Sequence, residues 1–141
     1  MTTTRENRKE ETHQILDDLS ITIKVLQNPY EFDTRHLFKM ATRINKKRSF
    51  LFVSTILGKH LAVKPQIPLL VGHLLSLRYM EVVHGSYDPR VYKLTEAIKT
   101  GKDAREALEM IKEKPIDLPK PITIIGFAET ATALGLSLIH I

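Results

Sequence analysis

The chain has 141 residues, of which 43% are hydrophobic and 26% charged, a composition typical of one soluble globular domain with its own core. It has no cysteine, which excludes disulfides, thiolate metal sites and a cysteine nucleophile, and no run of 18 apolar residues, so neither a membrane span nor a membrane partner is expected. The net charge of +5 favours anionic partners, either phosphorylated metabolites or nucleic acid. A charged N-terminus without an apolar signal core, together with the lack of cysteine, fits a cytoplasmic location.

The first part of the chain is predicted to alternate helices and strands. Residues 1–19 are expected to contain a helix, because Ile15, Leu16 and Leu19 recur at helical spacing. Residues 20–26 alternate apolar and polar side chains, which predicts a strand. Asp33 suits a helix N-cap, and a helix through residue 45 would bury four apolar side chains, Leu37, Met40, Ala41 and Ile44. The apolar run at residues 50–54 is typical of a buried parallel strand.

Helices dominate the prediction for the next part. Pro65 suits the first turn of a helix that runs to about residue 78, and residues 79–83 are expected to form a second strand. Asp88 followed by Pro89 starts a helix that ends at Gly101. Asp103 is expected to open another helix in a capping box with Glu106, and its inner stripe comprises Ala104, Ala107, Leu108 and Ile111.

A strand-to-helix turn is predicted near the end of the chain. Three prolines between residues 115 and 121 form a stiff connector to an apolar run at residues 122–125, which is expected to be a strand. Gly126 follows, and residues 129–134 can start a helix. Such a turn can bind phosphate through backbone N–H groups and the helix dipole. The same pattern also fits a turn without a ligand, and both interpretations stay open on the pattern alone.

This order of elements predicts an α/β fold, a parallel sheet with flanking helices and right-handed crossovers. Ligands of such sheets bind at the carboxyl ends of the strands. The loops at residues 54–60, 84–85 and 126–133 would then share one rim, to which Lys59 adds a positive charge and His60 a titratable group. His73, within an apolar helix, is interpreted as a core or interface histidine.

A run of basic residues lies on the predicted helix before residue 50 and at its end. It comprises Arg35, Lys39, Arg43, Lys46, Lys47 and Arg48. The run fits either a solvated helix end or an edge that faces an anion. A nucleic-acid-binding module would use these cations, but the sequence shows no known reading motif with exposed aromatic residues, so nucleic acid is not the expected partner.

Two long motifs resemble a phosphoribosyltransferase-like family whose members are often encoded beside bacterial tellurite-resistance and stress-response genes. The first lies in residues 28–63 and includes RSFLFVSTILGKH, residues 48–60. The second is GFAETATALG, residues 126–135. The resemblance covers residues 28–135 in the right order. It implies a type I phosphoribosyltransferase core, and a mobile lid would correspond to residues 86–114.

The resemblance also implies two anion-binding loops. The loop after the first core strand would hold pyrophosphate, with Lys59 as its cation, through Ser54, Thr55, Gly58, Lys59 and His60. The loop after the third strand would hold the 5-phosphate of phosphoribosyl pyrophosphate through Gly126, Glu129, Thr130, Ala131, Thr132 and Ala133. Lys59 and Glu129 are the candidate catalytic residues. Magnesium would enter through the pyrophosphate of the substrate, and no protein-bound metal site is evident.

The sequence departs from the family pattern at the third strand. Most type I enzymes carry two adjacent acidic residues there, which hold the ribose hydroxyls, whereas this chain has Ile125 and Gly126. Glu129 either substitutes for them or simply favours a helix N-terminus, and both roles stay open. A non-catalytic nucleotide-binding or regulatory protein on the same fold is therefore the alternative function.

The last six residues, LSLIHI, match a frame translation of a transposon end used in making sequencing libraries. We therefore expect residues 1–135 to be the N-terminal part of a single domain and residues 136–141 to be non-native. On this interpretation the sheet has an open edge, and the chain as it stands is expected to be inactive and prone to form homo-oligomers.

Overall fold

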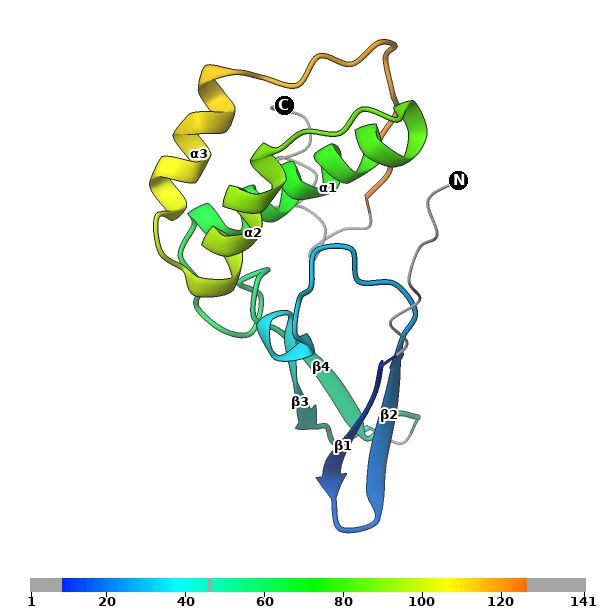
Figure 1. The fold of residues 1–141 in the computed structure, drawn as a ribbon. Helices are drawn as coiled ribbons and strands as arrows, with labels where there is room; N and C mark the ends of the chain where they lie inside the picture. Colours follow the sequence, from blue (N-terminus) through cyan, green and yellow to red (C-terminus); the bar gives the residue numbers. More distant parts are fainter. Residues whose placement is uncertain (1–8, 46, 127–141) are drawn as a thin grey trace. The chain divides into compact units, whose positions relative to one another are not determined.

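The computed structural model describes residues 9–45 and 47–126 (Figure 1). The chain divides into two compact units, Met1–Val53 and Ser54–Ile141. The first unit contains strands and a short 3-10 turn, and the second contains helices α1 to α3. The presence of both element types confirms the α/β character of the chain at this coarse level.

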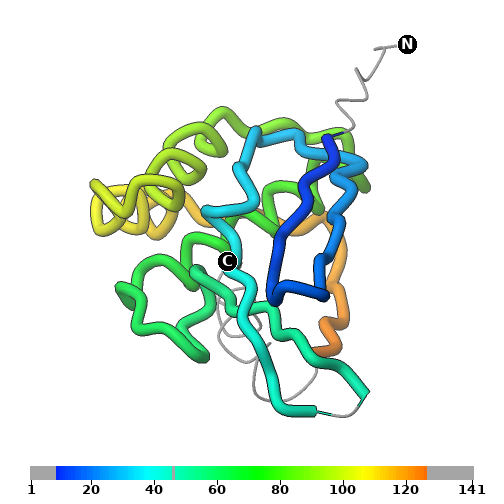
Figure 2. The backbone as a smooth tube through the Cα atoms, turned by 90° about the horizontal axis from the view of Figure 1, so that it is seen from below, coloured from blue at the N-terminus to red at the C-terminus, as the bar shows by residue number. Residues whose placement is uncertain are grey.

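The first unit begins with an antiparallel hairpin of β1 (Lys9–Leu16) and β2 (Leu19–Val25). Figure 2 traces it as two neighbouring blue segments of tube joined by a tight turn. Side chains alternate between a half-buried and an exposed face along both strands. Glu10 and Lys24 lie directly opposite each other, with Lys24 Nζ 3.1 Å from Glu10 Oε1. The strand predicted at residues 20–26 is confirmed, with a shift of one residue.

The helix predicted within residues 1–19 is wrong, because the described part of that range forms β1 and the start of β2. The apolar spacing of Ile15, Leu16 and Leu19 suggested helical periodicity, but Leu16 and Leu19 pair across a two-residue turn. Glu11, His13 and Ile15 alternate toward one face, which is the period of a strand. Because Glu11 and His13 on that face are polar, the sequence does not show the apolar–polar alternation that usually indicates a strand.

A second hairpin consists of β3 (Phe38–Thr42) and β4 (Phe50–Ser54). The Arg43 N–H donates to the Ser49 carbonyl at 2.8 Å and closes the connection. So short a connection joins antiparallel strands, because parallel strands need a crossover of a dozen or more residues. The strand predicted at residues 50–54 is confirmed, but its description as buried and parallel is wrong.

The helix predicted from Asp33 to residue 45 is also wrong. Asp33 does cap the chain, but only for the single 3-10 turn η1 (Thr34–His36), after which β3 begins. Ile44, expected in a buried stripe, is fully exposed at the hairpin loop. Strand pairing through residues 43 and 49 therefore overrides a local helix pattern.

The second unit is a group of three mutually packed helices, α1 (Gln66–His84), α2 (Arg90–Thr100) and α3 (Ala104–Glu113) (Figure 1). Its core contains one completely or almost completely buried large side chain from each helix, Leu70, Leu94 and Ile111. The predicted starts near Pro65 and Asp88, the end at Gly101 and the buried stripe of α3 are all confirmed. Asp103 precedes α3 as expected but makes no side-chain cap hydrogen bond, so the capping box does not form.

Two predicted strands of this unit are not formed. Residues 79–83 continue α1, which ends only where Gly85 adopts a left-handed conformation at φ 66° and donates its N–H to Glu81. Residues 122–125 have no regular secondary structure and are exposed. The strands of the described residues form two two-stranded sheets, so the expected parallel sheet is not observed there. Among the described helices, none is long and apolar enough to cross a membrane.

His73 is expected to make the stability of the helical unit depend on pH. Its side chain is 5% exposed, and its Nδ1 atom has no hydrogen-bond partner among the described residues. Burial, followed by the positive charges of Arg90 and Lys112, holds the pKa of His73 below its usual value. As pH falls below the unfolded-state pKa of about 6.5, the unfolded chain binds a proton that the folded one does not, so stability falls by at most about 1.4 kcal/mol per pH unit.

Urea unfolding between pH 5 and 8 would measure this effect. In the His73→Leu variant, the free energy of unfolding is expected no longer to fall as pH drops below the unfolded-state histidine pKa. The exposed His36→Gln variant should keep this fall. An identical pH profile in wild type and His73→Leu would contradict the assignment.

Candidate functional site

The loop after β4 has a defined local structure. Ser54 ends the strand, and its Oγ accepts hydrogen bonds from the N–H groups of Ile56 at 3.2 Å and Leu57 at 3.1 Å. The serine side chain thus folds the chain into a tight turn and satisfies two backbone donors. Residues 54–57 are half-buried, while Gly58, Lys59 and His60 are exposed.

Gly58 is required by the conformation of this loop. Its φ is +71°, in the left-handed region that favours glycine, and a Cβ atom there would lie 3.1 Å from Cγ2 of Val63. The reversal at Gly58 is followed at once by Lys59 and His60. The loop therefore presents an ammonium group and an imidazole next to exposed backbone, a combination suited to an anion.

The structure brings together one of the two predicted anion-binding loops. Ser54, Thr55, Gly58, Lys59 and His60 lie in the turn after β4, as expected from the sequence. Gly126 is described and exposed, but the strand expected before it is not formed. The other residues of the second loop lie outside the described residues: Glu129, Thr130, Ala131, Thr132 and Ala133.

Within residues 9–45 and 47–126, the rim expected from three parallel strands is not observed. His84, predicted at a strand end, lies at the C-terminus of α1, where its ring contacts Tyr79 edge-to-face with the centroids 5.6 Å apart. A position at a helix end gives it no shared sheet edge with residues 54–60.

The helical unit carries a basic pocket that the sequence did not single out. It has a volume of about 460 Å³ and is lined by Lys64, Gln66 and residues 101–105, which include Lys102 and Arg105. Lys64 Nζ donates to the Gly101 carbonyl at 2.7 Å and so joins two segments distant in sequence. No local motif predicts such a pocket, because its cations come together only when the helices pack.

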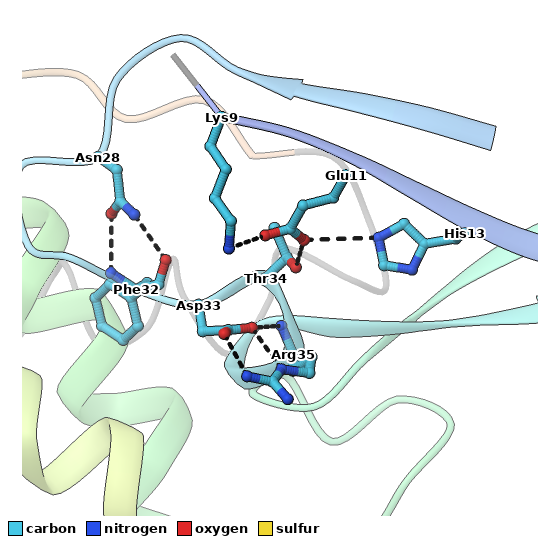
Figure 3. A network of polar contacts seen from close by, with 8 residues as sticks. All are labelled: Lys9, Glu11, His13, Asn28, Phe32, Asp33, Thr34 and Arg35. Atoms are coloured by element: carbon cyan, nitrogen blue, oxygen red, sulfur yellow. Dashed lines mark hydrogen bonds and ion pairs between the residues drawn. The ribbon is translucent and has the colours of Figure 1, made fainter. Parts of the chain in front are cut away.

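The first unit has a polar pocket of about 550 Å³ between β1 and the segment before η1 (Figure 3). Glu11 is its central acid. It lies 2.5 Å from Lys9 Nζ, accepts a hydrogen bond from the Thr34 hydroxyl and lies 3.8 Å from His13 Nε2. The hydrogen bonds from Lys9 and Thr34 lower the pKa of Glu11. The acid is therefore ionised at neutral pH, and its contact with Thr34 connects β1 to η1.

Asp33 is held in the same way on the other side of this network (Figure 3). Its carboxylate accepts hydrogen bonds from Arg35 Nε at 2.9 Å, from Nη2 at 2.7 Å and from the backbone N–H at 2.9 Å. The Arg35 side chain, followed by its backbone N–H, holds the pKa of Asp33 far below the usual range. Neither acid is therefore poised to exchange a proton near neutral pH.

The comparison with protein families agrees with the motif around β4. The sequence model of a family described as phosphoribosyl transferase matches residues 37–141. The match includes the β3–β4 hairpin, the loop at residues 54–60 and all three helices, whereas the β1–β2 hairpin precedes it. Neither a curated protein nor a solved structure matches the chain. Because the match covers most of its length, the chain belongs to the phosphoribosyl transferase family.

Proposed function

We propose that this protein binds phosphoribosyl pyrophosphate and transfers its phosphoribosyl group to a nitrogen base. Family membership supports the class of reaction. The structural observation that best supports the location of the site is the turn after β4. There Ser54 and Gly58 shape a loop that exposes Lys59. The type I core and the link to tellurite-resistance genes are finer parts of this proposal and rest on the sequence motifs.

Residues 54–60 are the proposed pyrophosphate subsite. Pyrophosphate carries several negative charges, which Lys59 would offset directly. Gly58 carries no side chain of its own, so backbone N–H groups beside its left-handed turn can approach the anion. His60 adds a donor whose charge depends on pH.

The transfer step exchanges one bond for another at C1 of the ribose. The bond from C1 to the pyrophosphate oxygen breaks, and pyrophosphate leaves with the electron pair. A lone pair on the base nitrogen forms the new C1–N bond, and the proton carried by that nitrogen passes to solvent. Lys59 would stabilise the negative charge that develops on the leaving oxygen, and electrostatic stabilisation of this kind is usually the largest single contribution to catalysis.

Magnesium fits this loop only through the substrate. Residues 54–60 contain hydroxyl groups, a lysine and a histidine but no carboxylate, whereas magnesium prefers carboxylate and phosphate oxygens. The pyrophosphate oxygens would hold the ion, and it would neutralise part of their charge.

Gly126 and residues 129–133 form the proposed 5-phosphate subsite. This part of the proposal rests on the sequence motif alone, in which Thr130 and Thr132 carry hydroxyl donors and Ala131 and Ala133 have small side chains. Glu129 is the proposed acid near the ribose. Because Ile125 and Gly126 stand where an acidic pair is usual, ligand binding without transfer is the second candidate function.

Two measurements on a full-length version of the protein distinguish these functions. Isothermal titration with phosphoribosyl pyrophosphate in the presence of magnesium is expected to show saturable binding. Pyrophosphate release with a panel of purine and pyrimidine bases is then expected to require both substrates. Binding without release under any base would favour the non-catalytic function, and absence of binding would overturn the proposal.

A further inference from the structure

The β3–β4 hairpin carries a concentrated positive charge. Between Phe38 and Phe52 the sequence contains no aspartate or glutamate. Four described cations of this stretch are exposed, Lys39, Arg43, Lys47 and Arg48. Within residues 9–45 and 47–126, none of these four takes part in an ion pair, whereas cations elsewhere, such as Lys93 and Lys112, lie beside carboxylates.

Aromatic rings line one face of the same hairpin. Phe50 and Phe52 lie two residues apart on β4 and share a face, with their ring centroids 5.9 Å apart. Phe38 of β3 joins them, 5.0 Å from Phe52. The Arg48 guanidinium lies 5.7 Å from the centre of the Phe50 ring, so charge and aromatic surface are adjacent. Phe52 is 42% exposed.

These two features together fit one kind of ligand. Proteins that bind single-stranded nucleic acid combine a positively charged surface for the phosphates with aromatic rings on which bases stack. A duplex offers phosphates but no free base faces, so it would use the cations alone. An anionic membrane would also meet the cations, but the edge-to-face rings on a strand surface do not form the broad apolar face of a membrane-binding helix.

We propose that the β3–β4 hairpin binds single-stranded nucleic acid, with its phosphates beside Lys39, Arg43, Lys47 and Arg48 and a base stacked on Phe52. This activity is separate from the proposed phosphoribosyl transfer. The sequence argued against nucleic acid because it shows no known reading motif with exposed aromatic residues. The hairpin replaces the helix predicted there, brings three phenylalanines together and places the Arg48 guanidinium beside one of them, Phe50.

Fluorescence anisotropy of the 141-residue chain with labelled oligothymidylate, oligouridylate and a mixed-sequence duplex tests this proposal. Four phosphate contacts predict that log K falls with log salt concentration at a slope of about −2.8, or roughly 50-fold between about 50 and 200 mM. Single strands should bind more tightly than the duplex, and the two single strands distinguish DNA from RNA as the preferred ligand. Equal affinity for duplex and single strand would overturn the stacking assignment.

Paired variants separate charge from stacking. Arg43→Gln with Lys47→Gln should reduce the steepness of the salt slope by about 1.4, whereas Lys93→Gln with Lys112→Gln, which remove the same charge elsewhere, should leave it unchanged. Phe52→Leu should weaken binding roughly 5- to 150-fold, and Phe52→Tyr should retain it because the ring remains. Circular dichroism of each variant reports whether the fold is kept.

Three outcomes would overturn the proposal. The first is an absence of binding even at low salt. The second is an equal loss of affinity in the two charge-matched double variants, because binding would then reflect net charge alone. The third is equally tight binding to phosphatidylserine vesicles with the same dependence on Phe52, because the hairpin would then be a membrane-binding surface.

Discussion

Leu94→Ala is expected to destabilise the helical unit by about 2–5 kcal/mol. Leu94 is completely buried in α2, in the core to which α1 contributes Leu70 and α3 contributes Ile111. Removing its side chain loses apolar burial and leaves a cavity that the packed helices can close only partly. A loss of this size is a large fraction of the stability of a small unit.

Urea unfolding followed by helical circular dichroism would measure this loss. The matched control is Leu75→Ala, because Leu75 lies on α1 but is 46% exposed. Its effect should stay within about 0.5 kcal/mol. Equal losses in the two variants would contradict the placement of Leu94 at the centre of the three-helix core.

Lys59→Ala is expected to lower pyrophosphate release on the order of 10²–10³-fold, as for removal of one preorganised group that stabilises developing charge. The reason is its place directly after the left-handed turn at Gly58, in the loop proposed to hold the leaving group. Lys59→Arg should recover part of the rate, because the charge remains while its geometry changes.

Two further variants make this prediction specific to the site. Lys120→Ala removes one exposed cation from the proline-rich connector and should leave release unchanged. Thr130→Ala tests the proposed 5-phosphate loop and should raise the concentration of phosphoribosyl pyrophosphate needed for half-maximal release. Unchanged release in both Lys59→Ala and Thr130→Ala would defeat the assignment of the two loops.

The helical unit could be predicted from local signals. Gly101 ends α2 in the left-handed conformation, and the inner stripe of α3 was correct at every position. These helices depend on residues three or four apart and on caps, which a sequence displays directly. The strand predicted at residues 79–83 failed because its β-branched residues, Val82 and Val83, also fit the exposed last turn of α1.

The hairpins were harder to predict, because strand pairing depends on residues that are distant in sequence. Asp33 was correctly identified as a cap, but the sequence does not show that the cap serves a single turn. The hydrogen bond from Arg43 to Ser49 and the contact of Phe38 with Phe52 decide between helix and strand. Neither contact is visible as a period in the local sequence.

The candidate site was predictable where it is one continuous loop. Ser54, Gly58 and Lys59 lie within six residues of one another, so a single sequence motif contains all three. The pocket lined by Lys64, Lys102 and Arg105 was not predictable, because helix packing creates it. A motif therefore identified the loop and its family, but not the pocket that the packed helices form.

The most direct test of the proposed site is the mapping of backbone amide shifts in a ¹⁵N-labelled chain titrated with phosphoribosyl pyrophosphate and magnesium. The largest saturable shifts are expected at Ile56, Leu57, Gly58, Lys59 and His60. Lys59→Ala should reduce them without altering the amides of α2. Saturable shifts confined to Lys64 and residues 101–105, with residues 56–60 unchanged, would contradict the assignment and place the anion in the basic pocket of the helical unit.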